Sequence, residues 1–219
     1  KHSGTLVFGD ARLLLLAVRS LSGTFAWVTS PYLLRRLVRD AAGAASDAPP
    51  AVPADPEMSD ASVKCLVAKD TKIAGGGGMV YLEDLDLTPT TSEDVASWAA
   101  WLGKRLWPND ETWQTMLQER FCIVPDDLMS FLASTATETI ARIRMESKTK
   151  TVAEGGLWYE EALPSESVLV GLAVATPVTA VGLSDNDIFG TLATLTKDAM
   201  QLGGKATVGR GLCRVLVTQ

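Results

Sequence analysis

The chain has 219 residues, of which 47% are hydrophobic, and a formal net charge of −6. These values are typical of a globular protein that buries a sizeable core as one domain, or as one domain with a large insertion, and they exclude a disordered chain. The longest apolar runs, at 13–18 and 168–175, are far shorter than the roughly 18 residues that indicate a membrane span. Three widely spaced cysteines argue against a disulfide scaffold and a CxxC zinc site, and they favour a reducing, cytoplasmic compartment.

Acidic residues are concentrated in the middle of the chain. Residues 41–138 contain 6 basic and 16 acidic side chains, whereas the remaining residues contain 14 basic and 10 acidic ones. The flanking segments are therefore mildly basic although the whole chain is acidic. This split permits a nucleic-acid partner, while an acidic middle segment is also typical of an ordinary solvated surface.

The first 40 residues predict two strands and a helix. The chain opens Lys1-His2-Ser3-Gly4, without an initiator Met, and runs almost directly into a strand pattern over 5–18, so we expect a natural N-terminal segment to be missing. A second strand is expected over 24–29. Ser30 then caps a helix that has Pro31 at its first position.

The acidic segment 41–138 is expected to be a largely helical insertion. A mobile loop rich in Ala, Pro, Ser and Asp covers 41–60, and strands are expected near 63–67 and 79–87. Thr91 begins a helix with Asp94 at capping-box spacing, and further helices cover 111–121 and begin at Pro125. The tetraglycine at 75–78 leads into a strand rather than a helix, which favours a flexible turn over a phosphate site.

The last third returns to strands. A strand over 139–145 precedes a polar segment, 146–156, that resembles an extended hairpin, and a buried strand covers 168–176. Ser184 caps a helix that runs to about Met200, and a glycine-rich loop and a closing strand, 212–217, follow. This order predicts an α+β fold with helices on one face of a sheet. A ferredoxin-like, RRM-type core with a helical insertion fits it best.

Two segments carry the residue types that bind a nucleic-acid backbone. In the loop Gly-Gly-Lys-Ala-Thr-Val-Gly-Arg-Gly at 203–211, glycines let amides approach a phosphate, and basic and hydroxyl side chains add donors. The loop lacks the spacing of a Walker A motif, and a plain glycine-rich turn is an equally good interpretation. The second segment, 142–152, alternates basic and small polar residues and reaches aromatic residues at 158–159, a pattern that suits single-stranded RNA. On composition alone, an ordinary solvated hairpin is the better interpretation of that segment.

Catalytic constellations are mostly absent from the sequence. His2 is the only histidine, so Ser-His-Asp and Cys-His mechanisms have no base. No cluster of carboxylates and histidine has metal-ligand spacing. Asp10 is better explained as a polar residue on the outer face of a strand than as a site carboxylate.

Three segments resemble a known family. The runs LVFGDARLLLLAVRSL at 6–21 and GTFAWVTSP at 23–31 are similar to the backbone subunit of the type III-B (Cmr) CRISPR effector, which belongs to the RAMP superfamily. The run TKTVAEGGLWYEE at 149–161 and the glycine-rich loop also match, in the family's order. The first match is long and specific, whereas the glycine-rich loop alone is a feature of the superfamily.

This resemblance implies a fold and a function. Members of the family have a modified RRM-like palm, which here would cover 1–40 and 139–219, and a protruding thumb hairpin at about 146–158. They stack on guide RNA in repeated copies beside other subunits, and they cleave paired target RNA with a metal-dependent aspartate that uses Mg²⁺. By carry-over, the RNA-binding residues would be Gly203, Gly204, Lys205, Thr207, Gly209, Arg210 and Gly211 in the loop, and Lys148, Thr149, Lys150, Thr151, Val152 and Trp158 in the hairpin.

One departure bears on catalysis. The family's catalytic aspartate lies ahead of the first strand seen here, and Asp10 does not correspond to it, so no catalytic residue is assigned and the chain as given is expected not to cleave RNA. The resemblance leaves two alternatives open. The chain could be another RAMP protein, such as the type III-A backbone subunit, or an α+β scaffold without RNA binding.

Overall fold

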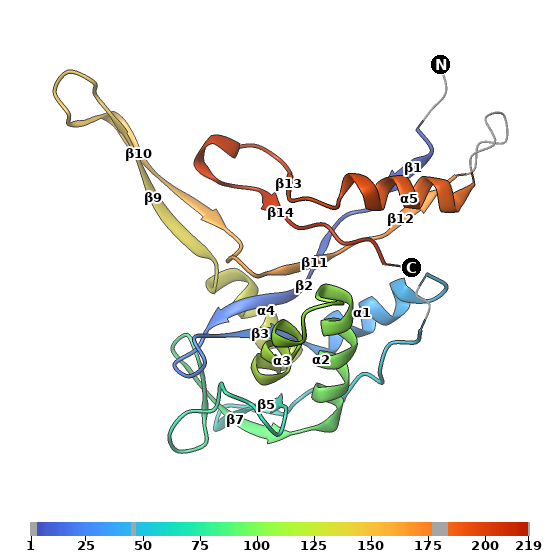
Figure 1. Cartoon of the computed structure of the whole chain (residues 1–219). Helices are drawn as coiled ribbons and strands as arrows, with labels where there is room; N and C mark the ends of the chain where they lie inside the picture. The colour runs from blue at the N-terminus through green and yellow to red at the C-terminus, as the bar shows by residue number, and fades with distance from the viewer. Residues whose placement is uncertain (1–3, 45–46, 177–183, 219) are drawn as a thin grey trace.

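The protein, seen here as a computed structural model, is a mixed α+β fold in which residues 4–44, 47–176 and 184–218 are described (Figure 1). Its helices are α1 (Pro31–Ala41), α2 (Glu93–Leu106), α3 (Glu111–Arg120), α4 (Asp126–Thr135) and α5 (Asp185–Leu195). Its first strands are β1 (Leu6–Phe8), β2 (Arg12–Arg19), β3 (Phe25–Thr29), β4 (Met58–Ser59), β5 (Ser62–Val67), β6 (Val80–Leu82), β7 (Leu85–Thr91) and β8 (Phe121–Ile123). The later strands are β9 (Glu138–Met145), β10 (Val152–Ala162), β11 (Val168–Val170), β12 (Ala173–Ala175), β13 (Met200–Gln201) and β14 (Leu212–Cys213). No helix in these described ranges has the length and apolar character needed to cross a membrane.

The main sheet has eight strands, seven of them in the order β11-β2-β3-β8-β5-β7-β6, with β4 paired to β5. β3 runs parallel to β8, with Trp27 opposite Phe121, and β5 runs parallel to β7. The segment 41–138 therefore supplies strands to the same sheet as β2 and β3, in addition to its helices. The division of the chain into a palm and an insertion stays a prediction.

The sheet curls so that the end of β2 meets β6. Ser20, directly after β2, forms an antiparallel bridge with Leu82, and the amide of Leu21 donates to the carbonyl of Tyr81 at 3.3 Å. On the same side, the Arg19 guanidinium donates to the Glu83 carboxylate, with Nη2 2.6 Å from Oε2. These contacts bring the first hairpin of the chain against the turn between β6 and β7.

Apolar residues cover both faces of the sheet. One face carries a core to which α4 contributes Leu128, Met129 and Leu132, together with buried residues of β2, β3, β5, β6, β7 and β8. The opposite face packs against α1, α2 and α3, with Trp27 and Trp98 fully buried there. The expectation of helices on one face is therefore wrong for α4, which lies on the other face, and α1 contributes Leu33 to the core on that face as well.

Local capping signals set several helix ends. α5 begins after Ser184, whose side chain accepts from the Asp187 amide while the Asp187 carboxylate accepts from the Ser184 amide, so the predicted cap is confirmed. The predicted N-cap of α2, Thr91, is wrong by one residue. Thr91 pairs with Val67 as the last residue of β7, and the side chain of Ser92 accepts from the Asp94 amide instead.

Two strands predicted as continuous are broken at the same place. The run 5–18 divides into β1 and β2, and the run 168–176 divides into β11 and β12. The breaks face each other, since the Gly9 amide donates to the Leu172 carbonyl at 2.8 Å. β11 then pairs with β2, and β12 pairs with β1. The second run is also not buried as predicted, because its residues are half-buried or exposed.

The end of the chain departs from prediction as well. α5 stops at Leu195, and Met200, expected within that helix, lies in β13. The closing strand shortens to the two residues of β14, because only Leu212 and Cys213 find partners, in β13. β13 and β14 form the base of the glycine-rich loop.

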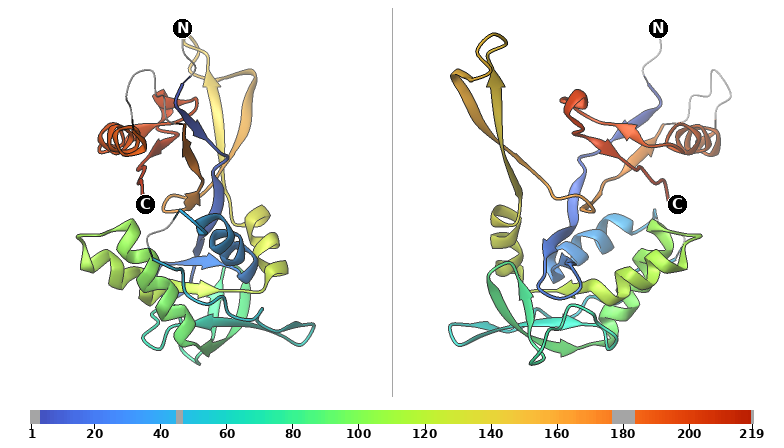
Figure 2. Two further views of the ribbon diagram at one scale, coloured as in Figure 1. Left: turned by 90° about the vertical axis from the view of Figure 1, so that its right-hand side faces the viewer. Right: turned by 60° about the vertical axis from the view of Figure 1, so that its left-hand side comes forward.

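A long hairpin projects from the rest of the molecule (Figures 1 and 2). It consists of β9 and β10, which pair only with each other among the described strands. The register shifts between Val152 and Leu157, so β10 carries extra residues opposite β9. This irregularity bends the hairpin near its outer end.

Candidate nucleic-acid interface

The hairpin has two chemically different faces. On one face, Ile143 lies opposite Leu157 and Met145 lies opposite Val152, and all four side chains are exposed. On the other face, Arg142 lies opposite Trp158, and Glu160 follows two residues further along β10. The hairpin therefore presents an apolar face and a charged face, and the charged one meets the glycine-rich loop.

The tip of the hairpin holds the predicted basic segment. Lys148, Thr149, Lys150 and Thr151 are exposed there. The turn is closed by hydrogen bonds from the Lys150 amide to the Glu146 carbonyl at 2.9 Å and from the Glu146 amide to the Thr151 carbonyl at 2.8 Å. The turn that carries the two lysines lies at the far end of the hairpin (Figure 2).

The glycine-rich loop is exposed from Gly203 to Gly209. At its base, the Leu202 amide donates to the Gly211 carbonyl at 2.8 Å. A Cβ atom on Gly211, whose φ is 73°, would overlap the Leu202 carbonyl oxygen. Gly211 is therefore required for closure of the loop, whereas a Cβ atom built on Gly203, Gly204 or Gly209 would meet nothing within 4 Å.

Lys205 organises the inside of this loop. Its backbone is left-handed, with φ of 62°, and it begins a 3₁₀ turn over Ala206–Val208. Its carbonyl oxygen accepts from the amides of Val208 at 3.1 Å and Arg210 at 3.3 Å. Fixing the position of Lys205 therefore fixes most of the loop.

The side chain of Lys205 reaches the hairpin. Its Nζ lies 2.7 Å from Oε1 of Glu160, which also accepts from the Trp158 indole N–H at 3.0 Å. The other carboxylate oxygen, Oε2, lies 3.4 Å from Nε of Arg142. The hydrogen bond from Lys205 and then that from Trp158 lower the pKa of Glu160 to about 2. Glu160 is therefore ionised throughout the neutral range, with three donors around it.

A second ion pair joins the loop to the hairpin. Nη1 of Arg210 lies 3.7 Å from Oε2 of Glu138, the first residue of β9. The Arg210 side chain is 23% exposed, and its carbonyl oxygen accepts from the side-chain amide of Gln201 at 2.6 Å. Arg210 thus lies against the hairpin stem and faces solvent less than Lys205 does.

The structure brings together some of the predicted site residues. The loop residues and Trp158 meet at the hairpin stem, whereas Lys148 to Val152 lie further out on the same hairpin. Sequence reasoning missed Glu160 and Glu138, whereas Arg142 belongs to the basic segment 142–152 but was not among the residues assigned to RNA binding. The alternation Trp158-x-Glu160 places both side chains on one face of a strand, but nothing local to it indicates a partner 45 residues further along the chain.

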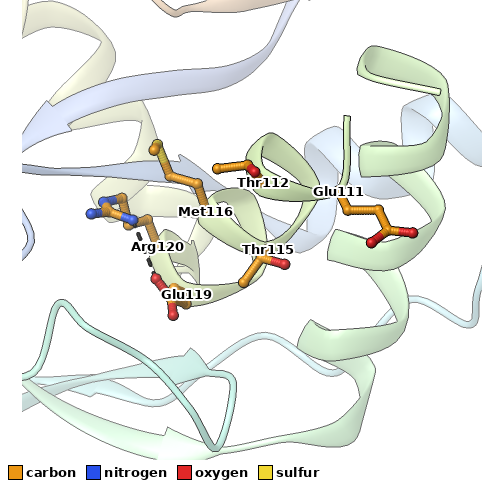
Figure 3. Close-up of a pocket in the computed structure, with 6 residues that line it drawn as sticks. All are labelled: Glu111, Thr112, Thr115, Met116, Glu119 and Arg120. Carbon is orange, nitrogen blue, oxygen red and sulfur yellow. Dashed lines mark ion pairs between the residues drawn. The ribbon is translucent and has the colours of Figure 1, made fainter. Parts of the chain in front are cut away.

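Other parts of the molecule provide weaker candidates for a functional site. A shallow hollow on α3 is lined by Glu111, Thr112, Thr115, Met116, Glu119 and Arg120. Figure 3 shows that these side chains come from one helix and that Arg120 pairs with Glu119, at 3.5 Å. Asp10, expected on a strand, is exposed in the break between β1 and β2. Within 4–44, 47–176 and 184–218, no three His, Cys, Asp or Glu residues gather as a metal ion would require.

Comparisons with known proteins agree with the resemblance in sequence. The family model described as the RAMP superfamily matches residues 1–214. The CRISPR system Cmr endoribonuclease Cmr4 of Pyrococcus furiosus is 30% identical over 223 residues, which cover 100% of this chain and 71% of the relative. The CRISPR system CMR subunit Cmr4 of Saccharolobus solfataricus is 27% identical over 104 residues, which cover 48% of this chain and 32% of the relative.

Solved structures show the same fold. Oligomeric Cmr4 from Pyrococcus furiosus superposes with a TM-score of 0.71 and 26% identity, over 99% of this chain and 75% of that one. A subunit of the type III-B Cmr-beta complex bound to cognate target RNA has a TM-score of 0.60 over 97% of this chain and 70% of that one, and at 14% identity it supports the fold alone. The chain belongs to the RAMP superfamily and, within it, to the Cmr4 family.

Proposed function

We propose that this protein is a backbone subunit of a type III-B CRISPR effector and that it binds guide RNA with the loop 203–211 and the hairpin β9–β10. The similarity to Cmr4 along the whole chain supports the assignment to such a complex. A relative of this fold forms oligomers and another is part of a complex bound to target RNA. The partners proposed for this chain are therefore guide RNA, complementary target RNA, further copies of itself and other effector subunits.

The observation that carries the proposal is the contact between Lys205 and Glu160. It joins two segments that were selected independently for RNA binding and that lie 45 residues apart. In this proposal the loop and the hairpin, joined by this contact, form one RNA-binding surface. A single RNA strand could follow this surface from the loop to the hairpin tip.

The loop has donors to offer a phosphate. Within the described residues, the exposed amides of Gly203, Gly204 and Lys205 make no backbone hydrogen bond. An ammonium has three donors, and Lys205 uses one on Glu160 while its side chain stays 58% exposed. Exposed amides beside a partly free ammonium are suited to phosphate oxygens. Thr207 adds an exposed hydroxyl, whereas the Arg210 side chain, 23% exposed beside Glu138, is less accessible to a phosphate than that of Lys205.

The hairpin supplies charge at its tip and an aromatic ring at its stem. Lys148 and Lys150 would neutralise phosphates, with Thr149, Thr151 and Val152 between and beside them. Trp158, 44% exposed, would support a base or the loop itself. In this proposal the hairpin is the thumb, and residues 1–40 and 139–219 form a ferredoxin-like palm that carries the segment 41–138.

No cleavage step is derived for this chain. The relative from Pyrococcus furiosus is named an endoribonuclease, and its family implies a divalent metal ion. The described carboxylates do not gather as ligands of such an ion, and we therefore assign neither a metal site nor a catalytic residue. The proposal concerns RNA binding and assembly.

RNA binding as a function of salt concentration tests the proposal. Binding of a fluorescent single-stranded RNA would be measured by anisotropy between about 50 and 200 mM salt, where each phosphate contact contributes about one to the slope of log K against log salt. The double variant K205A/R210A should bind more weakly and with a smaller slope. The variant K69A/K104A, which removes two exposed lysines from the segment 41–138, is the matched control.

The result separates the alternatives. Equal affinities of K205A/R210A and the parent would show that the loop assignment is wrong. Absence of RNA binding by the parent, by K205A/R210A and by K69A/K104A alike would favour an α+β scaffold without RNA binding. A type III-A backbone subunit would share RNA binding with the proposed one, and co-purification with type III-A or type III-B partners would distinguish the two.

A further inference from the structure

We propose that Glu160 is a positioning residue for RNA binding, whose carboxylate holds the Lys205 ammonium and thereby places the glycine-rich loop on the hairpin stem. This inference rests on the proposed function and deepens it, because it gives an acidic residue a defined part in an interface for an anionic partner. On charge alone, a carboxylate at such a surface would be expected to repel RNA.

The Glu160 carboxylate is surrounded by donors that hold it in place. Lys205 and Trp158 donate to one carboxylate oxygen, and Arg142 lies beside the other. The Glu160 side chain is 11% exposed, whereas the Lys205 side chain is 58% exposed. The carboxylate is thus covered by its three donors while the ammonium still faces solvent, so RNA has access to Lys205 but little to Glu160.

Holding Lys205 affects the loop as a whole. The backbone of this residue accepts two of the hydrogen bonds that shape the loop, from Val208 and Arg210. A side chain tied to the stem and a backbone at the centre of the turn make Lys205 the link between the hairpin and the exposed amides of the loop. Glu160 acts on the RNA through Lys205 and does not itself meet the RNA.

The ion pair between Arg210 and Glu138 is longer than the one between Lys205 and Glu160. Arg210 lies 3.7 Å from Glu138, a single contact to a carboxylate whose side chain is 42% exposed. Exposed ion pairs contribute little, because solvent screens them and long side chains lose freedom on pairing. The contact at Glu160 is shorter and has three donors, so it is the one that sets the position of the loop.

A competing possibility predicts the opposite effect on RNA affinity when the charge of Glu160 is removed. If Glu160 merely occupied the place of a phosphate, it would have to release Lys205 when RNA binds. Removing its charge would then strengthen binding, both by freeing Lys205 and by lowering the negative charge of the surface. If Glu160 positions Lys205, removing its charge weakens binding although the protein becomes less negative.

The variant E160Q distinguishes these two possibilities, because they predict opposite changes in RNA affinity. Its amide has nearly the same shape, but it loses the charge and can no longer accept from all three donors. We expect RNA to bind roughly threefold to tenfold more weakly at low salt, since the lost interaction is a hydrogen bond to a charged group on a partly solvated surface. The control E57Q removes the same charge from a pair of the same length, Lys64–Glu57 at 2.7 Å, in the segment 41–138, and should bind RNA within about twofold of the parent.

A double-mutant cycle tests the route through Lys205. In a K205M background, E160Q should cause no further loss of RNA affinity, because the group that Glu160 positions is gone. A merely structural role of Glu160 would weaken binding to a similar extent in both backgrounds. That outcome would contradict the proposal.

Hydrogen exchange gives a readout that needs no RNA. In E160Q, the hydrogen-bonded loop amides of Val208, Gly209 and Arg210 should exchange faster than in the parent, while those at the tip, 148–151, should be unchanged. RNA binding by E160Q equal to or tighter than that of the parent would overturn the inference and leave the proposed function intact. Absence of RNA binding by the parent itself would overturn the proposed function, and the exchange rates would then show whether the loop is tied to the stem.

Discussion

The indole N–H of Trp27 donates a hydrogen bond of 2.9 Å to the carbonyl oxygen of Glu166, 139 residues further along the chain. Trp27 lies in β3 and is fully buried. Its ring is 5.7 Å from that of Trp107 and 6.4 Å from that of Trp113, between centroids. One side chain therefore joins β3, the helices of the segment 41–138 and the turn that precedes β11.

The variant W27F tests this junction. It removes part of a buried ring and leaves the Glu166 carbonyl without its donor, so we expect the free energy of unfolding to fall by about 2–4 kcal/mol. Urea denaturation would measure this change in the free energy of unfolding. The control F131L, at a residue of α4 that is 53% exposed, should change stability by less than about 0.5 kcal/mol. Similar losses in the two variants would show that the junction does not stabilise the fold.

The tip of the hairpin should contribute charge to RNA binding without contributing to stability. In K148A/K150A, two exposed lysines are lost, and the slope of log K against log salt should fall by about two. The urea midpoint should stay at that of the parent, since neither side chain is buried. A slope equal to the parent's would place the RNA path away from the tip.

Closure of the glycine-rich loop should depend on Gly211 for a steric reason. In G211A, the new methyl group would meet the Leu202 carbonyl, so the β13–β14 base should open and RNA should bind at least about tenfold more weakly. The control is G43A, since Gly43 also has a positive φ, 83°, but has open space around it. Tight RNA binding by G211A would mean that the closed loop is not required.

The ion pair at Glu160 should respond to pH in the acidic range only. The pKa of Glu160 in the folded protein is lowered to about 2, whereas an unperturbed glutamate has a pKa of about 4.3. The stability that it contributes is therefore fully present above about pH 5 and is lost as the pH falls from there toward 2. The difference in unfolding free energy between the parent and E160Q should shrink over that interval and be constant above it.

Carboxyl chemical shifts measured by NMR would follow this titration directly. Lys205 provides the control, because the variant K205M removes the first cause of the lowered pKa. In that variant the Glu160 midpoint should move up toward the ordinary value. A midpoint near 4.3 in the parent would show that the ion pair is not formed in solution.

Local signals in the sequence were sufficient for many of the elements. Pro31 correctly marked the first residue of α1, although the Ser30 side chain makes no capping hydrogen bond, and Ser184 correctly marked the start of α5. Such signals act over one turn of helix. The parallel pairing of β3 with β8 could not be predicted, since Trp27 and Phe121 are far apart in the chain and neither indicates its partner. The paired breaks at Gly9 and Leu172 were missed for the same reason.

The candidate site shows the same difference between what local sequence predicts and what only contacts between distant residues determine. Glycines and basic residues identified the loop and the hairpin as separate candidates, because composition is a local property. Their meeting depends on how β10 is placed beside the β13–β14 base, which only the fold determines. Glu160 was overlooked because its acidic side chain has the wrong sign for a nucleic-acid site until its contact with Lys205 is known.

The meeting of β2 with β6 affects how other molecules can approach. A bare outer strand exposes a row of unpaired amides and carbonyls that can template the addition of strands from neighbouring chains and so lead to aggregation. Here the Leu21 amide already occupies the Tyr81 carbonyl, and the backbone of Ser20 bridges to Leu82. This border is therefore blunted from within the chain, and a copy stacked alongside would have to engage it through side chains rather than by extending the sheet.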